Sequence, residues 1–310
     1  MSRHPSPPIG AHSLILGAGS LGRLWGALLP DGSVTLVPRS APAGTRCHFQ
    51  FQPMTGPARR IALPWATAAT DLTHADLILV TTKAQDAPGA IESLRHRVPA
   101  STPLVLFQNG LGSQQTVCDR FPDYPVLAAS TTEGANRADS DTLTHAGTGD
   151  TWVGALNDAG SAVLAEVVRY LQASGLRIHA EPMIEPRLWQ KLVINAGINP
   201  FTAILDCPNG DILDHPFYQE RIDTLCRELL ALMRHEGLPA TSSDALRDRI
   251  ETVARATASN TSSMRADIRH RRKTEIDFIN GFVATRCEAL NLSARVNREL
   301  TNWVKDLEPE

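Results

Sequence analysis

A glycine-rich turn near the beginning of the chain constrains the fold more than any other feature of the sequence. Residues 14–25 read Leu-Ile-Leu-Gly-Ala-Gly-Ser-Leu-Gly-Arg-Leu-Trp, which fits the pattern G-x-G-x-x-G between an apolar run and a predicted helix. In such a unit the first glycine permits a tight turn, the second lets a pyrophosphate approach the backbone, and the third lets the helix pack closely on the strand. The free N–H groups of the helix then face the phosphates. We therefore predict that a dinucleotide is bound by Gly17, Ala18, Gly19, Ser20, Leu21 and Gly22, with a tight turn that holds no ligand as the alternative.

The first half of the chain alternates short apolar runs with helical stretches. The predicted strands are Ser13–Leu16, Val34–Val37, Leu77–Thr82, Leu104–Phe107 and Val126–Ala129. The helices between them include Leu21–Leu29 and Ala87–Val98, and the alternating run Cys47–Phe51 indicates one arm of a hairpin. Alternation of strands and helices predicts an α/β domain of the Rossmann type with a doubly wound parallel sheet.

The pattern changes after about Glu181, where only helices are predicted. These helices are Arg187–Ile198, Pro216–Glu236, Ser242–Ser259 and Glu275–Leu290. We expect the first of them to end or kink near Pro200, because proline lacks a backbone N–H. The predicted organisation is a flexible tail over 1–10, a Rossmann domain over 11–181 and an all-helical domain over 182–310.

Composition argues against several classes of function. Lys and Arg number 30 and Asp and Glu 33, so the net charge of −3 offers no general attraction to nucleic acid or to a membrane surface. No run approaches the roughly 20 apolar residues of a membrane helix, and the first residues do not read as a targeting segment. The five cysteines form no CxxC pair and no metal-binding spacing. These features predict a cytoplasmic protein without a metal site.

Three polar residues follow predicted strands, at the sheet edge where open α/β folds bind their ligands. Arg39 stands just after the second strand, where NAD-binding domains usually carry an acidic residue, and its guanidinium can pair with a 2′-phosphate. This indicates NADP(H), with a solvated surface arginine as the alternative. Lys83 and Asn109 come after two later strands and are expected to face the same crevice, although Asn109-Gly110 can also form an ordinary turn.

A second group of polar residues recurs along a mostly apolar helix. Lys191, Asn195 and Asn199 are spaced by four residues and fall within an arc of about 80° on one helix face. A 2-oxo acid presents a carboxylate, which amides can bind, and a ketone oxygen, to which a lysine can donate a proton. The pattern therefore suggests a substrate site, with a solvent-exposed polar stripe as the alternative.

A third group combines Ser263 with Glu275, twelve residues further on. On one straight helix they would be about 18 Å apart and could not share a small substrate. The capping pattern from Thr274 to Asp277 implies a new helical start, so we predict a break within residues 269–273 that brings both side chains to one crevice.

These motifs together resemble the ketopantoate reductase family over nearly the whole chain. The matching stretches are Gly17-Ala-Gly-Ser-Leu-Gly22, Thr82-Lys83-Ala84, Asn109-Gly110, Thr131-Thr132, Leu188-Trp-Gln-Lys-Leu-Val-Ile-Asn-Ala-Gly-Ile-Asn-Pro200, Cys207-Pro-Asn-Gly210, Ser262-Ser-Met264 and Thr274-Glu-Ile-Asp277. The resemblance implies a Rossmann domain followed by a helical domain, with the active site between them. It also implies NADPH-dependent reduction of 2-dehydropantoate to (R)-pantoate, on the route to pantothenate and coenzyme A.

The resemblance further assigns roles to single residues. Lys191 would be the general acid, and Glu275 would position the lysine, the cofactor or the substrate hydroxyl. The implied substrate contacts are Lys191, Asn195, Asn199, Asn209 and Ser263. The implied cofactor contacts are Arg39, Lys83, Asn109, Glu275 and the backbone around Ala135. The expected partners are a small 2-oxo acid and a second copy of the chain in a homodimer, with no nucleic acid and no membrane.

Two positions depart from the family pattern. Gln108 stands where many relatives have histidine, and Glu133-Gly134 replaces a frequent His-Ala pair. Both lie near the expected nicotinamide site, so they bear on which 2-oxo acid is reduced. The alternatives are a reductase of another branched 2-oxo acid and an NADPH-sensing regulator without catalysis; the presence of both Lys191 and Glu275 argues against the regulator.

Overall fold

The computed structural model describes residues 12–40, 44–137, 139, 141–239 and 242–309, so the predicted tail over 1–10 lies outside the described residues. The chain divides into two compact units. The sheet unit comprises the residues up to Gln108 together with Ser113–Ile184, and the helical unit comprises Asn109–Gly112 together with the residues from Glu185 onwards. The four residues Asn109–Gly112 thus belong to the helical unit although they lie within the first half of the sequence.

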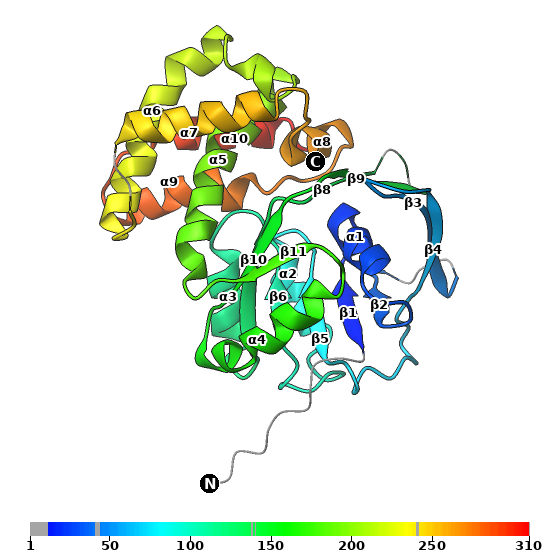
Figure 1. Ribbon diagram of the computed structural model, residues 1–310. Coiled ribbons are helices and arrows are strands. Elements are labelled where there is room, and N and C mark those ends of the chain that lie inside the picture. The colour runs from blue at the N-terminus through cyan, green and yellow to red at the C-terminus, as the bar shows by residue number, and fades with distance from the viewer. Residues whose placement is uncertain (1–11, 41–43, 138, 140, 240–241, 310) are drawn as a thin grey trace. The chain divides into compact units, whose positions relative to one another are not determined.

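A seven-stranded sheet forms the centre of the sheet unit (Figure 1), in the order β11-β10-β7-β6-β5-β1-β2. Its strands are β1 (Ser13–Leu16), β2 (Val34–Val37), β5 (Leu77–Val80), β6 (Leu104–Leu106), β7 (Val126–Thr131), β10 (Asp150–Ala155) and β11 (Arg177–Ala180). The five strands predicted from the sequence are all present. The predicted strands pair in parallel, whereas β10, which was not predicted, pairs antiparallel with β7. The sheet is mixed because the chain passes from β7 to β10 through two strands of the second sheet (residues 134–137 and 142–147) rather than through a crossover helix.

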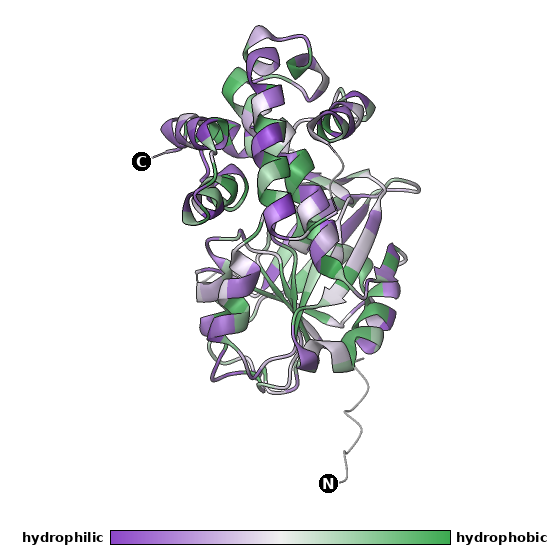
Figure 2. Cartoon of the chain, turned by 90° about the vertical axis from the view of Figure 1, so that its left-hand side faces the viewer, coloured by the Kyte–Doolittle hydropathy of each residue, from purple (hydrophilic) through white to green (hydrophobic). Residues whose placement is uncertain are grey.

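Two apolar clusters fill the two faces of this sheet. Successive side chains of a strand point to opposite faces, so Ile15 belongs to one cluster and Leu14 and Leu16 to the other. The first cluster includes residues of α1 (Ser20–Leu28) and α4 (Asp158–Gln172), and the second includes residues of α2 (Ala87–Glu92) and α3 (Ser113–Arg120). Figure 2 shows the central strands in green, the colour of hydrophobic residues.

The helix predicted over Ala87–Val98 is too long, because α2 ends at Glu92. The next residues form turns in which Leu94 N–H bonds to Ile91 and Arg97 N–H bonds to Leu94. These bonds span three residues and leave Leu94 and Val98 buried. The apolar residues that predicted a longer helix therefore lie in turns, in which an N–H bonds to the carbonyl three residues earlier.

A second, four-stranded sheet belongs to the same unit, in the order β4-β3-β9-β8. Its strands are β3 (Arg46–Gln52), β4 (Arg59–Pro64), β8 (Gly134–Arg137) and β9 (Thr142–Gly147). The predicted hairpin arm is confirmed, since β3 pairs antiparallel with β4. Cys47, Phe49 and Phe51 alternate with exposed residues along β3 and pack into the first apolar cluster.

The helical unit is built from helices alone within the described residues that follow Glu185. They are α5 (Ile184–Leu205), α6 (Pro216–His235), α7 (Ser243–Ala256), α8 (Ser263–Arg269), α9 (Asn280–Ala289) and α10 (Arg295–Asp306), with short 3₁₀ turns η1 (Gly210–Ile212) and η2 (Ile276–Phe278). The predicted helix over 275–290 is divided into η2 and α9, and α7 ends earlier than predicted. The predicted break within 269–273 is present, since α8 ends at Arg269 and Arg271 has a φ of +52°.

The first helix of this unit does not end near Pro200, which was one of the two outcomes expected there. Instead, α5 continues through Pro200 to Leu205. Proline cannot donate to the carbonyl four residues earlier, which is that of Ala196. The side-chain amide of Asn280 donates to this carbonyl at 3.2 Å and replaces the missing helical bond. A residue far along the chain thus permits the proline within the helix.

Candidate active site

Each glycine of the G-x-G-x-x-G loop lacks a side chain for a different structural reason. Gly17 follows β1 with a φ of +101°, and a Cβ there would lie 2.9 Å from the backbone nitrogen of Thr82. A Cβ on Gly22 would collide with the carbonyl of Gly17. A Cβ on Gly19 would have no neighbour within 4 Å. Gly17 and Gly22 are therefore required by packing, whereas Gly19 keeps open space before the N-terminus of α1, as a bound pyrophosphate needs.

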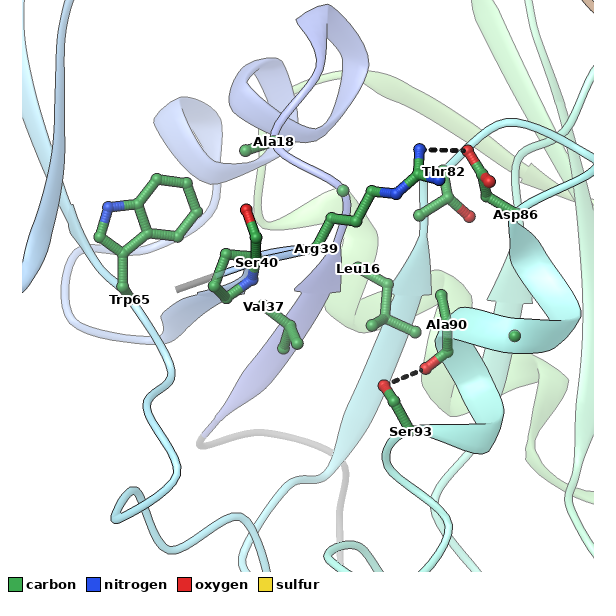
Figure 3. A pocket seen from close by; sticks show the side chains of 13 residues that line it. Leu16, Ala18, Val37, Arg39, Ser40, Trp65, Thr82, Asp86, Ala90 and Ser93 are labelled. Carbon is green, nitrogen blue, oxygen red and sulfur yellow. Dashed lines mark hydrogen bonds and ion pairs between the residues drawn. The ribbon is translucent and has the colours of Figure 1, made fainter. Parts of the chain in front are cut away.

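A cavity of about 520 Å³ adjoins this loop in the sheet unit (Figure 3). Its wall includes Ala18 from the loop, Arg39 and Ser40 beyond β2, Trp65, and Thr82 beyond β5. The hydroxyl oxygen of Thr82 is buried and has no hydrogen-bond partner in the structure. A cavity with apolar walls and an unsatisfied hydroxyl beside a glycine loop fits a bound nucleotide.

Arg39 lies at this cavity as its position in the sequence predicted. Its side chain is 88% exposed and its Nη1 is 3.5 Å from Oδ2 of Asp86. Figure 3 shows this ion pair at the edge of the cavity. A long ion pair between exposed groups contributes little stability. The guanidinium is therefore available to a negatively charged ligand in the cavity.

Sequence reasoning missed Trp65, Thr82 and Asp86 as residues of this cavity. Trp65 follows strand β4 of the second sheet and pairs with Leu36 as an isolated bridge, so no strand pattern marked it. Thr82 and Asp86 flank Lys83, and the rule that ligands bind beyond the carboxyl ends of strands would have found them. Lys83 is itself half-buried there, and its carbonyl accepts from the N–H groups of Asp86 and Ala87.

The two departures from the family pattern both lie in the sheet unit, with their side chains bonded internally. Gln108 is buried, and its amide donates to the carbonyls of Val80 at 2.8 Å and Thr82 at 2.9 Å. Glu133 is paired with His145 at 2.6 Å and accepts from the N–H of Gly149 at 3.0 Å. Both side chains thus stabilise the ends of strands. The neighbouring Ala135 lies in β8, opposite His145, and packs on the first apolar cluster.

In the helical unit, α5 carries the predicted polar face. Lys191 and Asn195 are half-buried and Asn199 is buried, so the alternative of a solvent-exposed stripe does not hold. Loss of water around Lys191 lowers the pKa of its ammonium group, the negative charge of Glu275 raises it, and the result is a pKa of about 8. Lys191 therefore exchanges its proton close to neutral pH.

Glu275 belongs to the same unit and has a second polar partner. Its Oε2 accepts from Nδ2 of Asn109 at 2.9 Å. The short segment Asn109–Gly112 is fixed on η2, because the N–H of Leu111 donates to the carbonyl of Phe278 at 2.8 Å. A Cβ on Gly110 would overlap that carbonyl. The structure thus brings Asn109, Glu275 and the charge of Lys191 together.

The remaining predicted substrate residues lie at the ends of neighbouring helices. Ser263 is exposed at the first position of α8, and the hydroxyl of Ser262 before it bonds to that of Thr202 on α5 at 2.7 Å. Asn209 is buried, and its Nδ2 donates to the hydroxyl of Thr257 at 3.0 Å. The Oδ1 atom of Asn209 is buried without a hydrogen-bond partner in the structure, which is a state that a ligand donor would relieve.

Two negative findings apply to the part of the chain that the structure describes. No group of three or more His, Cys, Asp or Glu side chains there is arranged to hold a metal ion. Within the same residues, none of the helices combines the length and the apolar character that crossing a membrane requires.

The fold and the two sets of residues define a class: a dinucleotide-binding α/β unit joined to a helical unit that carries a lysine and amides. The family described as ketopantoate reductase PanE/ApbA matches residues 13–158, and its C-terminal part matches residues 183–308. The chain belongs to this family. It is 34% identical to the 2-dehydropantoate 2-reductase of Vibrio cholerae over 95% of this chain and 97% of that protein. It is 35% identical to the enzyme of the same name from Escherichia coli O157:H7 over 96% and 95%.

Solved structures agree with the fold. A D-mandelate dehydrogenase in a ternary structure with NADH and anilino(oxo)acetate superposes with a TM-score of 0.84 at 21% identity, over 95% of this chain and 98% of that chain. A dimeric ketopantoate reductase from Staphylococcus aureus gives a TM-score of 0.79 at 22% identity, over 96% and 98%. Relatives of one fold therefore carry names for different 2-oxo acid chemistries.

Proposed function

We propose that this protein reduces 2-dehydropantoate to (R)-pantoate with NADPH, a step towards pantothenate. The observation that supports it best is the polar face of α5, where Lys191 has a pKa of about 8 beside the negative charge of Glu275. Asn195 and Asn199 share that face of a mostly apolar helix. The full-length relatives named 2-dehydropantoate 2-reductase support the same substrate.

Residues of the sheet unit would hold the cofactor, which supplies a hydride when bound. The N–H groups at the start of α1 and the open space at Gly19 suit the pyrophosphate. Arg39 suits a 2′-phosphate and supports NADPH over NADH. The unsatisfied hydroxyl of Thr82 supplies a further contact in the same cavity. Lys83 and Ala135 remain proposed cofactor contacts.

Residues of the helical unit would bind the 2-oxo acid and move the proton. The Lys191 ammonium would give its proton to the ketone oxygen as the ketone carbon accepts the hydride and the carbonyl π electrons move to that oxygen. Glu275 favours the charged form of Lys191, and Asn109 restrains Glu275 through its hydrogen bond. Asn195, Asn199, Asn209 and Ser263 are proposed to bind the substrate, and the unpartnered Oδ1 of Asn209 can accept from its hydroxyl groups.

A second substrate is favoured by one observation. The structural relative D-mandelate dehydrogenase holds anilino(oxo)acetate, and Gln108 and Glu133 replace residues frequent in the family. Reduction of another branched 2-oxo acid by the same residues is the alternative. We further propose a cytoplasmic protein that forms a homodimer, as the Staphylococcus aureus relative is described to do.

Steady-state turnover with a panel of 2-oxo acids tests these proposals. The purified protein is assayed with 2-dehydropantoate and with straight-chain, branched and aryl 2-oxo acids, each with NADPH and with NADH. The highest kcat/KM is expected for 2-dehydropantoate with NADPH. A higher value for another acid would establish the alternative substrate. Absence of turnover on the whole panel, with NADPH still bound, would contradict an enzymatic role.

A further inference from the structure

The strongest unassigned feature is a buried hydrogen-bond chain that ends on α5. Pro200 leaves the carbonyl of Ala196 without its helical donor. Ala196 is completely buried, so water cannot easily take the place of the missing N–H. The carbonyl lies in the turn of α5 between Asn195 and Asn199, which are both proposed to bind the substrate.

Asn280, the first residue of α9, supplies the missing donor. Its Nδ2 donates to the carbonyl of Ala196 at 3.2 Å and to Oδ1 of Asn297 at 3.0 Å. Both amide protons are thereby used, and the side chain has no exposed surface. Such an arrangement holds the amide plane in one orientation.

The chain continues to a buried carboxylate. Asn297 on α10 donates from Nδ2 to Oε2 of Glu228 on α6 at 2.8 Å. Glu228 also accepts the backbone N–H groups of Val296 at 2.9 Å and Asn297 at 3.0 Å, at the start of α10. The two backbone N–H groups and the Asn297 amide hold this carboxylate in place at the helix N-terminus. The Ala196 carbonyl is therefore connected to a rigid point of the helical unit.

We propose that Asn280 is a positioning residue for the substrate-binding face of α5. By satisfying the carbonyl that Pro200 leaves free, it keeps the helix regular through this turn. Asn199 then remains on the same face as Lys191 and Asn195. Without the donor, the helix would open at Pro200, and Asn199 would rotate away from the face that carries the lysine. Asn280 does not itself contact the substrate. The proposal rests on the proposed function of that face.

A double-mutant cycle with Pro200 tests this role. Asn280→Leu keeps most of the side-chain volume and removes the donor. Pro200→Ala restores a backbone N–H that can bond to the Ala196 carbonyl. The four proteins are wild type, both single variants and the double variant. For each, kcat and the KM for 2-dehydropantoate are measured, together with the Kd for NADPH and the Tm.

Asn280→Leu is expected to raise the KM for 2-dehydropantoate by about tenfold, with the NADPH Kd within about twofold of wild type. Addition of Pro200→Ala is expected to recover most of this loss, so the two substitutions are not additive. Thr301→Val is the matched control, since it removes a buried hydroxyl that donates to the carbonyl of Asn297 at 2.7 Å on α10 without a bond to α5. It is expected to lower the Tm and leave the KM unchanged.

Several results would overturn the proposal. They are an unchanged KM in Asn280→Leu, an equal effect of Asn280→Leu with and without Pro200→Ala, and a raised KM in Thr301→Val. If Asn280→Leu alone does not fold, the double variant with Pro200→Ala decides. A folded double variant supports the role of Asn280 as donor to the Ala196 carbonyl, and an unfolded double variant contradicts it. The turnover of the wild type separates the two proposals. An inactive wild type would refute the proposed function. The Tm values of the four proteins would still show whether Asn280 and Pro200 are coupled through the Ala196 carbonyl.

Discussion

At the scale of the residue, the pKa of Lys191 is set by its burial and by Glu275, whose carboxylate is held by Asn109. Burial lowers the pKa of its ammonium group and the charge of Glu275 partly opposes this, so that the pKa is about 8. A lysine in water would keep its proton far above this pH and would be a weaker acid. Burial, opposed by the neighbouring carboxylate, thus sets the pH range in which the proposed proton donor remains charged.

The pH dependence of reduction follows from this balance. The ammonium form is required, so kcat/KM is expected to fall as the pH rises through about 8. Glu275→Gln removes the charge that raises the pKa of Lys191, and the falling limb should move to lower pH. Asp277→Asn is the control, because that exposed carboxylate pairs with Lys305 at 2.7 Å. A pH profile that is the same in wild type and Glu275→Gln would contradict the coupling.

Cofactor choice is also a question about one residue. Arg39→Ala is expected to raise the KM for NADPH by about tenfold, because one exposed charge-assisted bond to the 2′-phosphate is lost. The KM for NADH should be unchanged, because NADH has no such phosphate. Steady-state kinetics with both cofactors measure this ratio, and Arg60→Ala, on the exposed strand β4, controls for loss of positive charge. An equal NADPH/NADH ratio in wild type and Arg39→Ala would refute the assignment.

At the scale of the element, the turn between β1 and α1 separates glycines needed for folding from one needed for binding. Gly22→Ala would press a methyl group against the backbone of Gly17, whereas Gly19→Ala would project into open space. The two substitutions add the same group to the same turn. They therefore form a matched pair.

The pair is expected to divide stability from binding. Gly19→Ala should melt near the wild-type temperature and lose NADPH affinity by about tenfold or more, because the methyl group enters the space for the pyrophosphate. Gly22→Ala should lower the Tm markedly, because backbone must move. Thermal unfolding and NADPH fluorescence titration measure both properties. Wild-type affinity in Gly19→Ala would exclude a pyrophosphate at this loop.

The elements also indicate what sequence reasoning can reach. The core strands and the polar face of α5 were predicted because they depend on local periodicity. The extension of α5 through Pro200 was not, since its cause is the amide of Asn280 in another helix. The antiparallel β10 and the second sheet were largely missed because their strands are partly exposed and mix polar with apolar residues. Tertiary contacts, rather than local propensity, determine these features.

The candidate site follows the same division. Arg39 and the glycine loop were predicted from their register beyond strands, and both border the cavity. The bond between Asn109 and Glu275 joins distant parts of the sequence and had no local signal. Trp65 follows a strand of the second sheet and likewise had none. Local sequence patterns therefore do not predict residues whose role depends on contacts between distant parts of the chain.

At the scale of the whole molecule, the two proposed tasks fall in different units. The glycine loop and Arg39 belong to the sheet unit, whereas Lys191 and the amides belong to the helical unit. Loss of the Lys191 side chain should therefore spare cofactor binding by the glycine loop and Arg39. This separation lets proton transfer be tested without loss of cofactor binding.

Lys191→Ala provides the most direct test of the proposed reaction, with Lys191→Met as the variant that keeps the length of the side chain. Without a proton donor the alkoxide must form in a poorly solvated site, so turnover of 2-dehydropantoate is expected to fall by about 10²-fold or more. The Kd for NADPH, measured by fluorescence titration of the same preparations, should stay within about twofold of wild type. Turnover close to that of wild type in either variant would contradict Lys191 as the proton donor.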